Sequence, residues 1–218
     1  MKKKIIALAV AAVMLAIAAI GGTFAYFTDH EEVDNVFTIG SVDIELIEST
    51  YHRAGAYGDG VEKTDDEIKA DAENYDDYLA EQGKNIVPGR RVMKNPYVIN
   101  NGDNAAYIRI RVIVDADLIE KLDIITTQTA VNDGSMLQTI TQDGDKLVAT
   151  FVYTEALEPG EMTYWNPISS FIIPTDLDNA DLAAFQDMDQ LIRVEADAIQ
   201  AETFDSAVAA FAAFDALN

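Results

Sequence analysis

The sequence contains no cysteine, and this absence removes several classes of protein at once. Without cysteine the 218-residue chain has no disulfide framework, no thiolate zinc site and no cysteine nucleophile. Histidine is almost as scarce, with only His30 and His52. The motifs H-E-x-x-H, G-x-S-x-G, S-x-x-K and the Walker sequence, which mark common hydrolases and nucleotide-binding proteins, are missing too. The chain therefore carries no recognisable catalytic signature.

Basic residues are also few. There are 15 of them against 38 acidic residues, and the formal net charge is −23. A field of this sign repels nucleic acid, so DNA and RNA are excluded as partners, whereas cations and basic partners are favoured. The remaining composition, with 49% hydrophobic and 24% charged residues, is that of an ordinary globular protein with one sizeable core.

The N-terminus has the organisation of an export signal. Three lysines at 2–4 precede an uninterrupted apolar run at 5–20, and small residues occupy the first and third positions before a cut after Ala25. This pattern predicts a signal peptide over 1–25 and a mature chain that begins at Tyr26. The alternative is an uncleaved membrane anchor, because the stretch without charge is long enough to span a bilayer. In both cases the rest of the chain lies outside the cytoplasm.

The mature chain, residues 26–218, is predicted to be a single all-β domain. Its apolar residues alternate with polar ones, or form short β-branched and aromatic runs, at 42–46, 108–114, 147–153, 171–173 and 191–199. Turn sequences separate these runs, namely Pro88-Gly89, Asn100–Gly102, Asn132–Gly134, Asp143-Gly144 and Pro159-Gly160. Many short strands with such turns indicate a jelly-roll-like β-sandwich.

Two short helices are expected at the periphery of this sandwich. The first lies in an insertion at 51–84, where a capping box at Thr64–Glu67 precedes apolar residues at helical spacing, namely Ile68, Ala72, Tyr75 and Leu79. The second lies near the C-terminus, where one helical face carries Phe204, Val208, Phe211 and Ala212. Both helices are interpreted as packing elements rather than cofactor sites.

Few residues are candidates for metal binding. His30 and His52 lie far apart in the sequence, and no spacing requires them to converge on a zinc ion. Asp176, Asp178 and Asp181 form the best local cluster of hard oxygen ligands, which suits calcium. This cluster departs from the EF-hand spacing and lacks its terminal glutamate, so a solvated acidic loop is the favoured interpretation and a calcium site is the alternative.

Two further features have both a structural and a functional interpretation. Trp165, the only tryptophan, is expected to pack in the core or a turn, with a ligand platform as the alternative. Arg109 and Arg111 share one face of an otherwise apolar strand. They are expected to pair with surface acids, which contributes little stability. The alternative is a docking stripe for an acidic neighbouring subunit.

Several segments resemble a known family. The sequence around the proposed cut, 21–29, and the following segment, 35–44, carry its most specific part. The middle of the chain at 87–89 and 98–109 and the C-terminal residues 196–205 are also similar. Together they resemble the TasA/camelysin family of Gram-positive bacteria. The resemblance implies export by a SipW-type signal peptidase, a jelly-roll domain at the cell surface, and assembly into biofilm matrix fibres.

Fibres of this family imply donor-strand complementation, in which the N-terminus of one subunit completes the sheet of the next. Here the donor would be residues 26–36, with apolar anchors at Tyr26, Phe27, Val33 and Val36. The partners would be further copies or related matrix subunits. Two alternatives remain, a camelysin-like surface metalloprotease and a non-catalytic accessory or adhesive subunit. The family's peptidase label brings no motif that maps onto this chain, so no catalytic residue is assigned.

Overall fold

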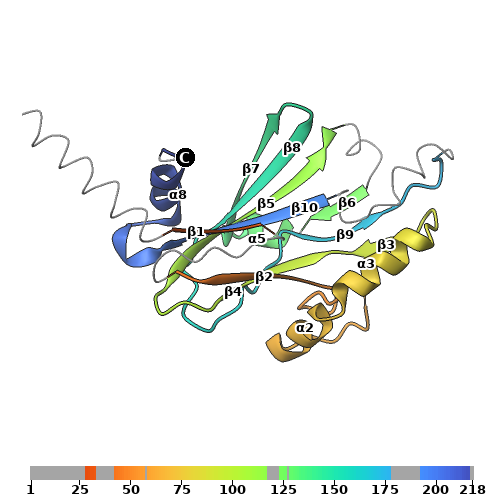
Figure 1. The fold of residues 1–218 in the computed structure, drawn as a ribbon, viewed down its shortest axis with the longest axis horizontal. Helices are drawn as coiled ribbons and strands as arrows, with labels where there is room; N and C mark the ends of the chain where they lie inside the picture. Colours follow the sequence, from red (N-terminus) through yellow and green to blue (C-terminus); the bar gives the residue numbers. More distant parts are fainter. Residues whose placement is uncertain are drawn as a thin grey trace, which may run out of the picture.

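The largest sheet of the molecule is five-stranded and antiparallel. A computed structural model of the chain describes residues 28–32, 42–56, 58–116, 123–126, 128–177 and 192–216. The sheet has the strand order β1-β10-β5-β8-β7 (Figure 1). Its strands are β1 Thr28–Glu32, β5 Ala106–Asp115, β7 Met136–Asp143, β8 Lys146–Tyr153 and β10 Ile192–Gln200. Strands from both ends of the chain therefore meet in one sheet, with β1 and β7 at its two edges.

Two smaller sheets form the opposite layer. One pairs β2 Ile44–Ser49 with β4 Asn95–Asn100, and the other has the order β3-β9-β6, with β3 Arg91–Met93, β6 Asp123–Thr126 and β9 Ile168–Ile172. Strands β3 and β4 follow each other directly, and the Lys94 N–H between them donates to the Ser169 carbonyl at 2.9 Å. The two small sheets consequently continue one another.

The core lies between these layers. Alternate residues of the large sheet point inward, because successive side chains of a strand face opposite sides. They pack against apolar residues of the small sheets in one cluster, whose buried members include Ile44, Val98, Ile108, Ile110, Val112, Phe151, Phe171, Ile192, Val194, Ala196 and Ala198. The prediction of an all-β sandwich with peripheral helices is confirmed.

The insertion contains two helices rather than the one that the apolar spacing predicts. They are α2 Asp65–Ala72 and α3 Tyr75–Lys84, and they lie outside the small sheets (Figure 1). The capping box is confirmed, since the Thr64 hydroxyl accepts from the Glu67 N–H and the Glu67 carboxylate accepts from the Thr64 N–H. The helix breaks because Asn74, a residue that favours caps, turns its N–H back to the Asp71 carbonyl. Ile68, Tyr75 and Leu79 remain buried across the break.

The C-terminal helix is present, but its buried face differs from the prediction. Helix α8 spans Ala207–Asp215 and follows a short 3-10 turn, η1 Ala201–Thr203. It begins after Ser206, whose hydroxyl accepts from the Ala209 N–H, so its buried face is Ala207, Ala210 and Phe211. Val208, expected on that face, is 55% exposed, and Phe204 precedes the helix.

One further helix is short, α5 Gln128–Asn132. Within the described ranges, no helix has the length and apolar character needed to cross a membrane. The predicted signal peptide over 1–25, with its expected cut between Ala25 and Tyr26, lies outside the described residues and stays a prediction.

Candidate functional site

Strand β1 forms one edge of the large sheet. It pairs antiparallel with β10, with Thr28 opposite Ile199 and Glu32 opposite Glu195. It belongs to the segment expected to act as a donor, and in this single chain it completes the sheet of its own subunit. The anchors Tyr26, Phe27, Val33 and Val36 lie outside the described residues. Their contact with a second subunit stays a prediction.

The register places acidic residues of β1 opposite unusual neighbours. Asp29 and Glu31 lie opposite Ala198 and Ala196, which are fully buried alanines of the core. In the same register, Glu32 lies opposite Glu195 and His30 lies opposite Asp197. The three acidic residues of β1 therefore lie at one edge of the large sheet.

The outer face of β10 and β5 carries a cluster of ion pairs. The register sets Arg109 opposite Asp197 and Arg111 opposite Glu195. Arg109 contacts the Asp197 carboxylate at 2.6 Å, and Arg111 contacts Glu195 at 2.9 Å and Asp197 at 3.4 Å. Arg193 adds a contact to Glu195 at 2.7 Å. Charges of both signs alternate across the two strands, and each buried carboxylate has an arginine partner.

Helix α8 covers this cluster. Its Asp215 contacts Arg109 at 2.7 Å, and the guanidinium lies 4.7 Å from the ring centroid of Phe211 and 5.2 Å from that of Phe214. Burial alone would lower the pKa of Arg109, but the carboxylates of Asp197 and Asp215 outweigh it, and the pKa is raised. Arg109 therefore stays charged inside the protein.

The expected pairing of Arg109 and Arg111 with acids is confirmed, but the expectation that these acids lie on the surface is wrong. Asp197 is fully buried, and Glu195 and Arg109 are almost so. The reason is tertiary, because α8 packs over a face that the alternation of β10 alone would leave in water. Arg109 is paired with Asp197 and Asp215 of its own chain, which favours the structural interpretation of the two arginines.

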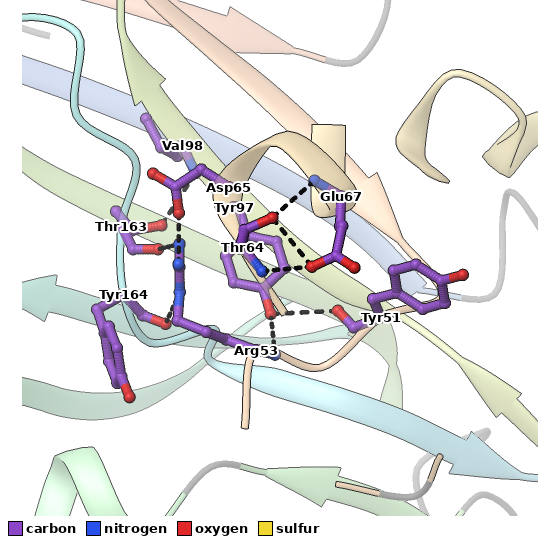
Figure 2. A network of polar contacts seen from close by, with 9 residues as sticks. All are labelled: Tyr51, Arg53, Thr64, Asp65, Glu67, Tyr97, Val98, Thr163 and Tyr164. Atoms are coloured by element: carbon purple, nitrogen blue, oxygen red, sulfur yellow. Dashed lines mark hydrogen bonds and ion pairs between the residues drawn. The ribbon is translucent and has the colours of Figure 1, made fainter. Parts of the chain in front are cut away.

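A second polar network connects the insertion at 51–84 to the β-sandwich. Arg53 pairs with Asp65 at the start of α2, and its guanidinium also donates to the carbonyls of Thr163 and Tyr164 (Figure 2). It lies between the rings of Tyr97 and Tyr164, 5.8 Å and 5.2 Å from their centroids. These contacts involve strand β4, the insertion and the segment before β9. Their role is to position α2.

Tyr97 is the buried centre of this network. Its hydroxyl accepts from the Arg53 N–H at 2.9 Å and donates to the Tyr51 carbonyl at 3.2 Å. Burial raises the pKa of Tyr97 to about 12. Tyr97→Phe is expected to lower the free energy of unfolding by about 1–3 kcal/mol, because two backbone groups lose their partner. Urea denaturation measures this change.

The control is Tyr164→Phe, whose residue is 49% exposed. Its hydroxyl is open to water, so we expect a change within about 0.5 kcal/mol. Equal effects of the two substitutions would contradict the role given to Tyr97.

The candidate metal ligands are only partly described. Of the acidic cluster, Asp176 is described, whereas Asp178 and Asp181 lie outside the described residues, and nothing is known of the side chain of His30. Within the described part of the chain, no three histidine, aspartate or glutamate side chains converge as metal ligands. His52 is nearly buried, and its Nδ1 accepts from the Ala54 N–H at 3.2 Å.

Burial lowers the pKa of His52 below its usual value of 6.5. The folded state thus prefers the neutral ring, and the unfolded state binds the proton more readily. Stability is therefore expected to fall as the pH drops through about 6.5, the usual pKa of the unfolded group, into the acidic range. His52→Gln should show a shallower fall over this range in urea denaturation. Identical slopes in the two proteins would remove His52 from the pH dependence.

Trp165 packs as the structural interpretation expects. It is half-buried against the main core, and its carbonyl accepts from the Tyr153 hydroxyl. The Tyr164 ring meets it edge-on, with centroids 4.9 Å apart. Its contacts are those of a residue that packs at the margin of the core.

The fold and the site define a class of protein, an all-β sandwich whose N-terminal strand forms an edge of the main sheet. Residues 1–52 match the model of a family described as camelysin metallo-endopeptidase. The match includes the segment that carries the most specific part of the resemblance, and it confirms the likeness to the TasA/camelysin family in that part of the chain. No curated protein and no solved structure matches the chain.

Proposed function

We propose that this protein is a secreted structural subunit of extracellular biofilm matrix fibres, joined by exchange of the N-terminal strand. One observation carries the proposal. The segment expected to act as a donor forms the edge strand β1, and β10 is its only strand partner among the described residues. A strand held on one side can be replaced by the same strand of another copy, and the exchange conserves the backbone hydrogen bonds.

The position of β1 supports this exchange. Strand β1 pairs with one neighbour, β10, over five residues, so a short ladder of backbone hydrogen bonds has to be exchanged. In the fibre, the anchors Tyr26, Phe27, Val33 and Val36 add apolar contacts with the next subunit. The partners are then other copies of this chain or related matrix subunits, after a SipW-type signal peptidase has freed the N-terminus.

The net charge of the chain sets a condition on assembly. The chain has a formal charge of −23, and removal of the three lysines at 2–4 with the signal peptide leaves 12 bases against 38 acids, near −26. Subunits with this charge repel each other, so salt or divalent cations should promote fibre growth. Calcium is a candidate for this role, with Asp176, Asp178 and Asp181 as its proposed ligands. A rate of polymerisation that falls as the salt concentration rises would oppose this proposal.

The test is negative-stain microscopy of two forms of the protein, one beginning at Tyr26 and one beginning at Phe37. Filaments from the first form alone support a donor strand within residues 26–36. Filaments from both forms place the joint elsewhere. Filaments from neither form reject the homopolymer and favour an accessory or adhesive subunit that adds to a fibre of another protein.

A second candidate function is a cell-surface metallopeptidase, favoured by the description of the matching family. The assay is cleavage of an unfolded protein substrate with and without a chelator. This function predicts activity that the chelator abolishes and that His30→Ala or His52→Ala reduces. Activity that survives both the chelator and the two substitutions would exclude a histidine-bound metal.

A further inference from the structure

Strand β7 is the other edge of the large sheet, and it lacks the features that protect such edges. It is eight residues long, pairs with β8 in an unbroken register, and has no proline, no bulge and no charge before its last residue. Edge strands in soluble proteins are normally short, charged or distorted, because their unpaired backbone groups recruit other strands. By contrast, the opposite edge, β1, contains three acids.

The side chains of β7 are also open to contact. Ile140 is 63% exposed and Leu137 is 42% exposed, and the residues from Thr139 to Asp143 are all exposed. In the strand order of the described residues, β7 comes last, with β8 as its only neighbour. Figure 1 shows β7 at the edge of the large sheet, with β8 beside it. A partner strand can therefore approach this edge.

The sequence of β7 identifies the partner. Residues 138–142 read Gln-Thr-Ile-Thr-Gln, which is the same in both directions. In an antiparallel pair of two copies centred on Ile140, each residue of this segment meets a residue of its own kind. The stretch from Met136 to Gln142 has no charge, so the two strands meet without charge repulsion although each chain carries −23. A second copy of the chain can therefore supply hydrogen-bond partners for the backbone groups of β7 that face the open edge.

The backbone directions agree with that centre. The Thr154 N–H donates to the Ser135 carbonyl at 3.1 Å, so the odd-numbered residues of this strand turn their backbone groups toward β8. The even-numbered residues, Gln138, Ile140 and Gln142, consequently turn theirs toward the open edge. A two-fold axis at Ile140 pairs this outward set with itself and forms about six backbone hydrogen bonds. An axis between two residues would set outward groups opposite inward ones and leave them unpaired, so the axis lies on a residue, and the palindrome places it at Ile140.

We propose that β7 is a self-association edge, where a second copy of this chain pairs antiparallel with Ile140 on the two-fold axis. The two large sheets then continue across the axis. Such an interface is isologous and closes at two subunits. It is independent of the N-terminal strand, because β1 and β7 lie at opposite edges of the sheet. In a fibre it would join subunits side by side.

The test uses thiol cross-linking, since the chain has no other cysteine. The full chain is expressed as Ile140→Cys, and the purified protein is treated with a short bismaleimide. The matched control is Val61→Cys, at an apolar residue with similar exposure, 58%. The proposal expects dimers from Ile140→Cys about tenfold faster than from the control, since the pair holds residues 140 about 5.5 Å apart. Equal rates overturn it.

Two measurements fix the register and the energetics. A mixture of Thr139→Cys and Thr141→Cys chains should cross-link faster than either chain alone, because residue 139 meets residue 141 of the partner. The opposite order overturns the axis at Ile140. In sedimentation equilibrium, Ile140→Lys should weaken the dimer about tenfold or more by placing like charges together, whereas Val61→Lys should not. An unchanged dimer in Ile140→Lys also overturns the proposal.

Discussion

Replacement of Asp197 by alanine is expected to lower the free energy of unfolding by about 3–5 kcal/mol, the cost of leaving a buried charge without its partner. Asp197 is fully buried and contacts both Arg109 and Arg111. Without it, Arg109 keeps only Asp215, which lies at the more exposed side of the cluster. Because a domain of this size is stable by about 5–15 kcal/mol, this single change removes a large part of the total. Urea denaturation measures it.

A matched surface pair provides the control. Lys84 and Glu81 lie 4.0 Å apart on α3, and both are well exposed. Lys84→Ala should change the stability by less than about 0.5 kcal/mol, since exposed ion pairs contribute little. The double replacement Arg109→Met and Asp197→Leu should recover much of the loss, because well-packed apolar residues substitute for a buried pair. A loss below about 1 kcal/mol in Asp197→Ala would show that water reaches the cluster.

Locking β1 to β10 with a disulfide is expected to abolish filament formation. Thr28 and Ile199 lie directly opposite each other, and Thr28→Cys with Ile199→Cys gives the only two cysteines of the chain. Opposite residues of an antiparallel pair are about 4.5–5.5 Å apart between Cα atoms, within the range of a disulfide. The oxidised protein cannot release its N-terminal strand to a neighbour. Negative-stain microscopy before and after reduction measures the effect.

Reduction should restore the filaments of the double variant, and Ile199→Cys alone should form them under both conditions. This control separates the lock from the loss of the buried isoleucine side chain. Filaments from the fully oxidised double variant would mean that subunits join without strand exchange, and the fibre would then need a different joint. The truncation at Phe37 and the lock therefore test the same step by opposite means, one by removing the strand and the other by retaining it.

The central strands could be predicted from the sequence because β5 and β10 alternate and β8 is rich in β-branched and aromatic residues. In β5, β8 and β10 the predicted runs agree with the observed strands to within two residues at each end. Ile192, Val194, Ala196 and Ala198 are buried together, as their spacing predicts. These strands are long and contribute one face to the core, so their hydrophobic residues alone predict where the strands lie.

The edge strands could not be predicted in the same way. Strand β7 buries only Met136, so its sequence has no apolar face to detect. Strands β3 and β6 have three and four residues, and their conformation depends on pairing with β9 rather than on their own pattern. Short or exposed strands are defined by their neighbours, which a local pattern does not contain.

The sequence predicts which charged residues of the ionic cluster share a strand face, but it does not predict their pairing or their burial. The alternation of β5 places Arg109 and Arg111 on one face, and the same reading of β10 leaves Glu195 and Asp197 opposite the core. Their pairing depends on a contact between residues 88 positions apart, and their burial depends on Asp215 and Phe211 of the last helix. Neither the pairing nor the burial can be predicted from the residues that neighbour Arg109 and Arg111 in the sequence.

The position of β10 between β1 and β5 determines when the main sheet can be completed. Synthesis delivers the chain from its N-terminus, so β1 emerges before its partner β10, at Ile192–Gln200, and the other described strands lie between the two in the sequence. Contacts across such a separation form slowly, because a long loop must close before they are made. The β1 edge of the main sheet therefore cannot form until β10 has been released. Under the proposed strand exchange, this topology would delay linkage between newly made subunits.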